Sequence, residues 1–219
     1  MNEYLQLEQR EHKDRIYNSF GVIMVKPHAL EVGFDIIISD LLSNVGNPLY
    51  DKMNISEETR NCLSKLVICK TKIINFKKDI NLFNKFLNTS YKDQINTNHY
   101  EILKMLYFSR WMFYIVAHEG TQEELDRSLK EFKGQRELLN QRKQIISNPI
   151  GVRGIFLDTG IIYETISDFE KEIIYKKTVN NLIHTSDNIY EAKFLINILL
   201  DSNEISEMEK YEILRIRNF

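Results

Sequence analysis

The chain is organised around an apolar stretch that ends in a lysine and a proline: Phe20-Gly21-Val22-Ile23-Met24-Val25-Lys26-Pro27. Its four consecutive apolar residues predict a buried strand. The proline ends that strand, because it has no backbone N–H to donate to a sheet. Residues 31–44 then predict a helix with its apolar side chains on one face. Lys26 therefore stands at a strand-to-helix turn, where a lysine either points at a ligand phosphate or is simply solvated.

Strand and helix patterns alternate along the rest of the chain. Strand patterns occupy residues 63–76, which we expect to be half exposed, and 111–118, with a short element at 152–156. Helix patterns occupy residues 1–18, 80–86, 99–107, 121–132, 136–146, 161–177, 187–200 and 205–216. Three or four strands with helices on one face predict an α+β fold. We expect a ferredoxin-like antiparallel sheet with a βαββαβ core covered by helices, decorated by N-terminal, internal and C-terminal helical segments.

Composition limits the class of protein. A chain of 219 residues can bury one sizeable core, and we expect a single domain over residues 1–219 with its core at about 20–200. The net charge of -2 gives no global basic footprint for nucleic acid. Two cysteines, Cys62 and Cys69, argue against a disulfide scaffold and a cysteine zinc site, and fit a reducing cytoplasm. The N-terminus has no apolar signal core, and no apolar run approaches the ~20 residues of a membrane span.

A histidine near the end of the chain is the strongest candidate for chemistry. It lies in the stretch Asn181-Leu182-Ile183-His184-Thr185-Ser186-Asp187, just before the helix pattern at 187–200. Histidine is a good nucleophile at neutral pH. Ser186 and Asp187 can cap that helix, and a helix N-terminus attracts anions such as phosphate. The alternative is a histidine that merely occupies a turn. His118, at the end of a predicted strand, is interpreted as a packing or capping residue.

Three motifs occur in an order that resembles the nucleoside diphosphate kinase family. That family has a first strand ending in Lys-Pro-Asp, a Pro-Gly-x-x-Arg-Gly loop, and Asn-x-x-His-x-Ser-Asp around a phosphorylated histidine. The corresponding stretches here are Lys26-Pro27, Pro149-Ile150-Gly151-Val152-Arg153-Gly154 and residues 181–187. The resemblance extends in patches over about residues 20–200, with gaps and insertions.

The resemblance implies a nucleotide phosphotransferase. His184 would take the γ-phosphate of a nucleoside triphosphate and pass it to a diphosphate acceptor, in ping-pong chemistry. Mg²⁺ would arrive with the nucleotide, so that the protein itself supplies no metal ligands. The partners implied are nucleoside triphosphates and diphosphates, with no nucleic acid or membrane, and a homo-oligomer is an open alternative. The location implied is the cytoplasm.

The resemblance also assigns the other site residues. Lys26 and Arg153 would hold phosphate oxygens, and Asn181 would bond the sugar or the phosphates. Tyr100 would lie near the histidine, and Ser186 and Asp187 would support it. Lys130 stands four residues before Gly134, where the family usually has an arginine.

Several departures from the family pattern keep other functions open. His28 and Ile155 replace two aspartates. The family's glutamate, eleven residues after the histidine, is Leu195 here, and Glu191 could replace it only if the helix were rotated or shifted. Residues 45–60 and 157–180 are expected insertions. One alternative is a nucleotide-binding or protein-interaction module with weak or no catalysis. Another is a related transferase whose acceptor is not a plain nucleoside diphosphate.

Overall fold

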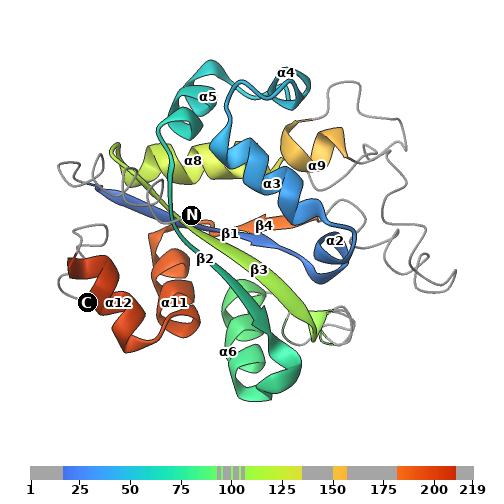
Figure 1. Cartoon of the computed structure of the whole chain (residues 1–219), viewed down its shortest axis with the longest axis vertical. Helices are drawn as coiled ribbons and strands as arrows, with labels where there is room; N and C mark the ends of the chain where they lie inside the picture. Colours follow the sequence, from blue (N-terminus) through green and yellow to red (C-terminus); the bar gives the residue numbers. More distant parts are fainter. Residues whose placement is uncertain are drawn as a thin grey trace, which may run out of the picture.

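The computed structural model describes residues 17–92, 95, 100, 104, 107–134, 150–156 and 182–210. Its centre is one antiparallel sheet of four strands in the order β2-β3-β1-β4 (Figure 1). The strands are β1 (Ser19–Val25), β2 (Val67–Asn75), β3 (Arg110–His118) and β4 (Ile183–Thr185). This strand order with covering helices confirms the predicted α+β, ferredoxin-like fold.

Helices cover both faces of the sheet (Figure 1). On one face lie α6 (Ile80–Ser90) and α11 (Ile189–Leu199); on the other lie α3 (Phe34–Ser43), α5 (Glu57–Ser64) and α8 (Gln122–Lys133). The shorter elements are α2 (Pro27–Glu31), α4 (Leu49–Lys52), the 3₁₀ turn η1 (Phe76–Lys78) and α9 (Gly151–Ile155), and α12 is Ser202–Lys210. The expectation of helices on one face only is therefore wrong.

The uninterrupted apolar run of β1 explains the two covered faces. Side chains alternate across a strand, so Val22 and Met24 enter one core cluster while Ile23 and Val25 enter the other. Every residue of β1 is buried. A strand with apolar side chains on both sides needs cover on both sides. β2, by contrast, lies at the sheet edge and is half buried, as its mixed pattern predicts.

Local corrections concern the segments between the strands. The helix expected at 31–44 begins only after Gly33, which adopts a left-handed conformation with φ 75°; this helix is α3, and the separate short helix α2 precedes it. The expected insertion at 45–60 contains the short helix α4 and the start of α5. Tyr50 anchors this segment, since its hydroxyl donates to Leu41 O at 2.7 Å.

Near the histidine, two further elements differ from expectation. The last strand is β4, which pairs with the end of β1, and the residues around Arg153 form the helix α9. The helices expected at 136–146 and 161–177, and all but the last two residues of the helix expected at 1–18, lie outside the described residues. Every helix in the described ranges is too short or too polar to cross a membrane.

Candidate functional site

His184 lies at the centre of β4, opposite Met24 of β1, with its side chain only 12% exposed. Its Nε2 atom is 3.3 Å from Oε1 of Glu191. The second carboxylate oxygen of Glu191 accepts from the backbone N–H of Asp187 at 2.8 Å, which fixes the carboxylate. When Nε2 carries the proton and donates to Glu191, Nδ1 keeps its lone pair and is the nucleophilic nitrogen.

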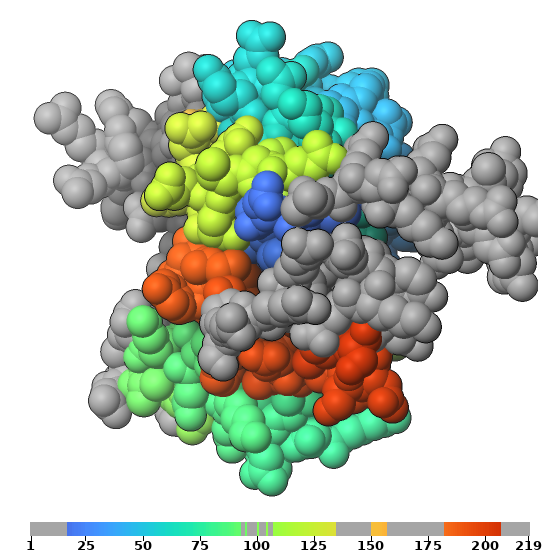
Figure 2. Space-filling view, turned by 90° about the vertical axis from the view of Figure 1, so that its left-hand side faces the viewer, coloured from blue at the N-terminus to red at the C-terminus, as the bar shows by residue number. Residues whose placement is uncertain are grey.

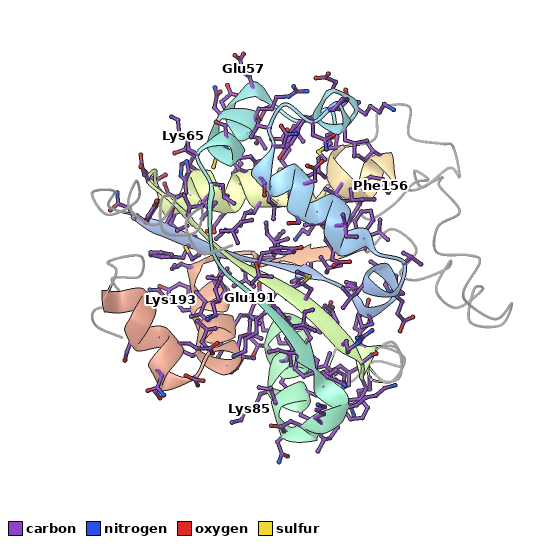
Figure 3. The ribbon with its side chains drawn as sticks, in the orientation of Figure 1. Glu57, Lys65, Lys85, Phe156, Glu191 and Lys193 are labelled. Atoms are coloured by element: carbon purple, nitrogen blue, oxygen red, sulfur yellow. The ribbon has the colours of Figure 1, made fainter. Side chains whose placement is uncertain are left out.

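The start of α11 places Glu191 beside the ring. Asn188 caps this helix by accepting from the backbone N–H groups of Tyr190 and Glu191, so neither Ser186 nor Asp187 is the N-cap. Glu191 is the third residue of the helix and lies near the middle of the molecule (Figure 3). Its carboxylate accepts from a backbone N–H just before the helix, as in a capping box. Leu195, at the family's glutamate position, is fully buried in the core. The spacing Asn188-x-x-Glu191 was the sequence signal for this arrangement.

The surroundings of His184 keep its imidazole neutral. Burial lowers the pKa of His184, the charges of Lys133 and Lys26 lower it further, and the contact with Glu191 opposes them. The net pKa lies below the ordinary value for histidine. A neutral ring with an oriented nitrogen is the form of histidine that attacks phosphorus or carbon.

Lys26 is fully buried next to the histidine. Its Nζ atom donates to the hydroxyl of Tyr107 at 2.7 Å and lies 4.6 Å from the centre of that ring. The ring of Tyr91 lies 5.6 Å from Lys26 Nζ and, centre to centre, 5.7 Å from the ring of His184. Burying an ammonium group is costly without compensation, and here two aromatic rings and a hydroxyl supply part of it.

Arg153 approaches the same strand from α9 and is 5% exposed. Its Nε and one terminal nitrogen donate to the carbonyl of Ile183, at 3.2 and 2.6 Å. Two glycines allow α9 to lie this close to α8. Gly134 and Gly151 have φ of 82° and 67°, and a Cβ on Gly134 would stand 2.0 Å from Ile150 O. Gly134 and Gly151 therefore permit the close packing that brings the arginine to β4.

Lys133 is the site residue that the sequence interpretation missed. It is 9% exposed, and its Nζ donates to Oδ1 of Asp187 at 2.9 Å. Lys130, predicted for this role, lies on the exposed face of α8. The two residues are almost one helical turn apart, so only the packing of α8 decides which of them faces β4.

Tyr100, Ser186 and Asn181 complete the set of predicted site residues. The hydroxyl of Tyr100 donates to Asn88 Oδ1 at 2.5 Å, and it is Tyr91 whose ring stands beside His184. Ser186 ties β4 to β1, because its hydroxyl accepts from Val22 N–H at 3.0 Å. Asn181 lies outside the described residues.

The assembled site joins a neutral histidine to mainly cationic surroundings. Three cations, Lys26, Arg153 and Lys133, accompany two carboxylates, Asp187 and Glu191. The start of α11 reaches the surface between α8 and α6 (Figure 2), and the N-terminus of a helix favours an anion. Both carboxylates are already engaged by protein groups, so the described part of this site offers no cluster of free oxygens for a metal ion.

The sheet order and the covering helices define a nucleoside diphosphate kinase-like fold. A solved structure of nucleoside-diphosphate kinase from Borrelia burgdorferi, a transition state mimic with bound vanadate and ADP, has a TM-score of 0.53 at 18% identity and covers 87% of this chain and 95% of its own. The nucleoside diphosphate kinase from Aquifex aeolicus has a TM-score of 0.48 at 15% identity, and the match covers 85% of this chain and 97% of that chain. The nucleoside diphosphate kinase from Encephalitozoon cuniculi has a TM-score of 0.46 at 14% identity, and the match covers 87% of this chain and 98% of that chain.

No family model matches the chain, and no curated protein matches it. At 18% identity, the likeness to the Borrelia burgdorferi structure establishes the fold alone.

Proposed function

We propose that the protein is a nucleotide phosphotransferase that carries the γ-phosphate from a nucleoside triphosphate to a diphosphate acceptor on His184. One observation supports this most strongly: a histidine that is shielded, kept neutral and contacted by a carboxylate that its own helix fixes. A solvated histidine in a turn would have none of these features.

The chemistry follows from the two ring nitrogens. The lone pair of Nδ1 attacks the γ-phosphorus, the new N–P bond forms, and the bond from phosphorus to the bridging oxygen breaks, which releases the diphosphate. Glu191 accepts the Nε2 hydrogen bond and stabilises the positive charge that the ring gains. The acceptor's terminal phosphate oxygen then attacks phosphorus and the N–P bond breaks, so the enzyme returns to its first form.

The cations would hold the phosphate oxygens during both steps. Lys26 donates to the Tyr107 hydroxyl and Arg153 donates to the Ile183 carbonyl, and each would exchange this protein oxygen for a phosphate oxygen when the nucleotide enters. Lys133 takes the role predicted for Lys130, with Asp187 as its partner in the free enzyme. Mg²⁺ bound to the nucleotide would reduce the charge on its phosphates, while the contacts of Asn181 and Tyr100 with nucleotide stay predictions.

A second candidate function is nucleotide binding or protein interaction with weak or no catalysis. The observation in its favour is the burial of the two cations, Lys26 and Arg153, against Tyr107 and the carbonyl of Ile183. These contacts must be exchanged before phosphate can be held, and that exchange slows or prevents turnover if the protein contacts are the more stable.

The test is incubation with ATP, Mg²⁺ and a panel of nucleoside diphosphates, with product triphosphates separated by chromatography. We expect transfer in the wild type, an acid-labile and base-stable label on the protein, and loss of both in His184→Ala. Label that persists in His184→Ala would refute the phosphohistidine. ATP binding in a calorimeter without any transfer would favour the second function. Label on the protein without transfer to any diphosphate would indicate a different acceptor.

A further inference from the structure

A second group of reactive side chains lies away from His184, at the other end of the sheet. Cys62 of α5, His118 at the end of β3 and Glu124 of α8 each present one ligand atom, and these atoms lie within 4.8 Å of one another. The three elements meet on the side of the sheet where Lys65 ends α5 (Figure 3). Among the described residues this is the group of His, Cys and acidic side chains that is compact enough to share an ion.

The position along β1 separates this group from the phosphotransfer site. His118 pairs with Ser19 and His184 pairs with Met24, five residues further along the same strand. At about 3.4 Å per residue, the two histidines are roughly 17 Å apart along the sheet. A ligand at one site would therefore not touch the other.

Two polar atoms of the group have environments that point to an ion. His118 is buried, and its Nε2 has no hydrogen-bond partner among the residues that the structure describes, a condition that is rare for a buried nitrogen. The buried hydroxyl of Ser128 contacts the thiol of Cys62, which places a donor where a thiolate would need one. The second cysteine, Cys69, lies on β2 and is not a member of the group.

We propose that Cys62, His118 and Glu124 form a binding site for a single divalent transition-metal ion, best suited to Zn²⁺. One sulfur, one imidazole nitrogen and one carboxylate oxygen are ligands that zinc accepts in tetrahedral geometry, with water as the fourth. Mg²⁺ prefers oxygen ligands only, so the ion that accompanies a nucleotide would not occupy this site. A mixed site needs one cysteine, and the low cysteine content of the chain does not oppose it.

Binding changes the protons in a defined way. The Cys62 thiol loses its proton to solvent and a metal–sulfur bond forms, so that a thiolate and the Glu124 carboxylate together balance the two positive charges. His118 Nδ1 now accepts from Gly120 N–H at 3.0 Å. That bond breaks whichever ring nitrogen binds the metal, because a metal-bound neutral imidazole carries its proton on the other nitrogen. Gly120 is partly exposed, so water can replace the lost partner.

Burial raises the pKa of Cys62 and disfavours its thiolate, whereas the hydroxyl of Ser128 and the charges of Lys65 and Arg127 favour the thiolate. The two cations also repel a free metal ion. The bound ion would join α5 to the end of β3 and the start of α8. It would therefore act as a structural link.

The experiment is a titration of the full-length, chelator-treated protein with Co²⁺, followed by displacement with Zn²⁺. We expect one ion per chain, a near-ultraviolet thiolate-to-cobalt band, and a change in the Gly120 amide resonance. Cys62→Ser should abolish the band, Glu124→Gln should weaken binding tenfold or more, and Cys69→Ser should keep both band and affinity.

Absence of the band in the wild type would overturn the proposal, and this measurement does not depend on how any variant folds. A band that survives in Cys62→Ser, or disappears in Cys69→Ser, would overturn it as well. Nucleotides are not used, so the result stands independently of the phosphotransfer function.

Discussion

Replacement of Glu191 by glutamine tests the arrangement around His184 most directly. The contact between His184 and Glu191 spans 3.3 Å, and both side chains are only 12% exposed, so solvent screens it weakly. A hydrogen bond to a charged group contributes about 1.5–3 kcal/mol, and a neutral one about 0.5–1.5 kcal/mol. Glu191→Gln can keep a neutral bond to Nε2 but loses the charge, a difference of roughly 1–1.5 kcal/mol, which corresponds to about five- to tenfold in rate. Because its other terminal group is an NH₂ donor, the variant also loses the bond from the Asp187 N–H, so this loss in rate is a lower bound.

The loss should appear in kcat, because the ring gains positive charge only as the N–P bond forms. Glu191→Ala removes the whole bond, so about ten- to 150-fold is expected, on the same conversion. The pKa of His184 should fall in both variants, because Glu191 raises it in the wild type. Transfer is followed by the product triphosphate, and the pKa by NMR of the ring protons.

The matched control is Glu204→Gln. Glu204 bonds Lys70 and Lys72 on β2 and has no contact with His184, so kcat should be unchanged. An unaltered kcat in Glu191→Gln, in a protein whose transfer still requires His184, would refute the role assigned to Glu191.

Three further predictions concern charge, pH and packing. Lys133→Met should raise the pKa of His184, since Lys133 lowers it, and should weaken ATP binding by about tenfold. The control Lys85→Met, on the exposed face of α6, should change neither quantity. NMR of the ring protons measures the pKa, and calorimetry measures ATP binding. Burial and the charge of Lys26 lower the pKa of His28 to about 3. The folded-state pKa of His28 lies below its unfolded value, so the unfolded state takes up a proton first as the pH falls. The free energy of unfolding is therefore unaffected by His28 above pH ~6.5, and it decreases by up to about 1.4 kcal/mol per pH unit as the pH falls toward 3. Denaturant unfolding at several pH values should show that slope, and His28→Gln should reduce it; equal slopes would contradict the assignment. Leu195→Glu, which places a carboxylate at the family's position, should lower the free energy of unfolding by several kcal/mol because that side chain is fully buried among apolar neighbours. A melting temperature equal to the wild type would show that the helix can turn this position toward His184.

Features that depend on neighbouring residues along the chain could be predicted from the sequence. The apolar run from Val22 to Val25 is a strand in almost any compact context, and Thr121 begins α8 because its hydroxyl accepts from Glu124 N–H. The order of the motifs also singled out His184, Lys26 and Arg153 as candidate site residues, and their roles stay predictions. Each of these signals lies within a few residues.

Contacts between residues far apart in the chain depend on packing, which the sequence pattern does not reveal. Lys133 rather than Lys130 contacts Asp187, and Tyr91 rather than Tyr100 stands beside His184. Both choices depend on how a helix or loop packs against β4, a strand of three residues that has too little local pattern to be recognised. The physical reason is that helical periodicity fixes the spacing of side chains, whereas the packed core fixes which of them points at the site.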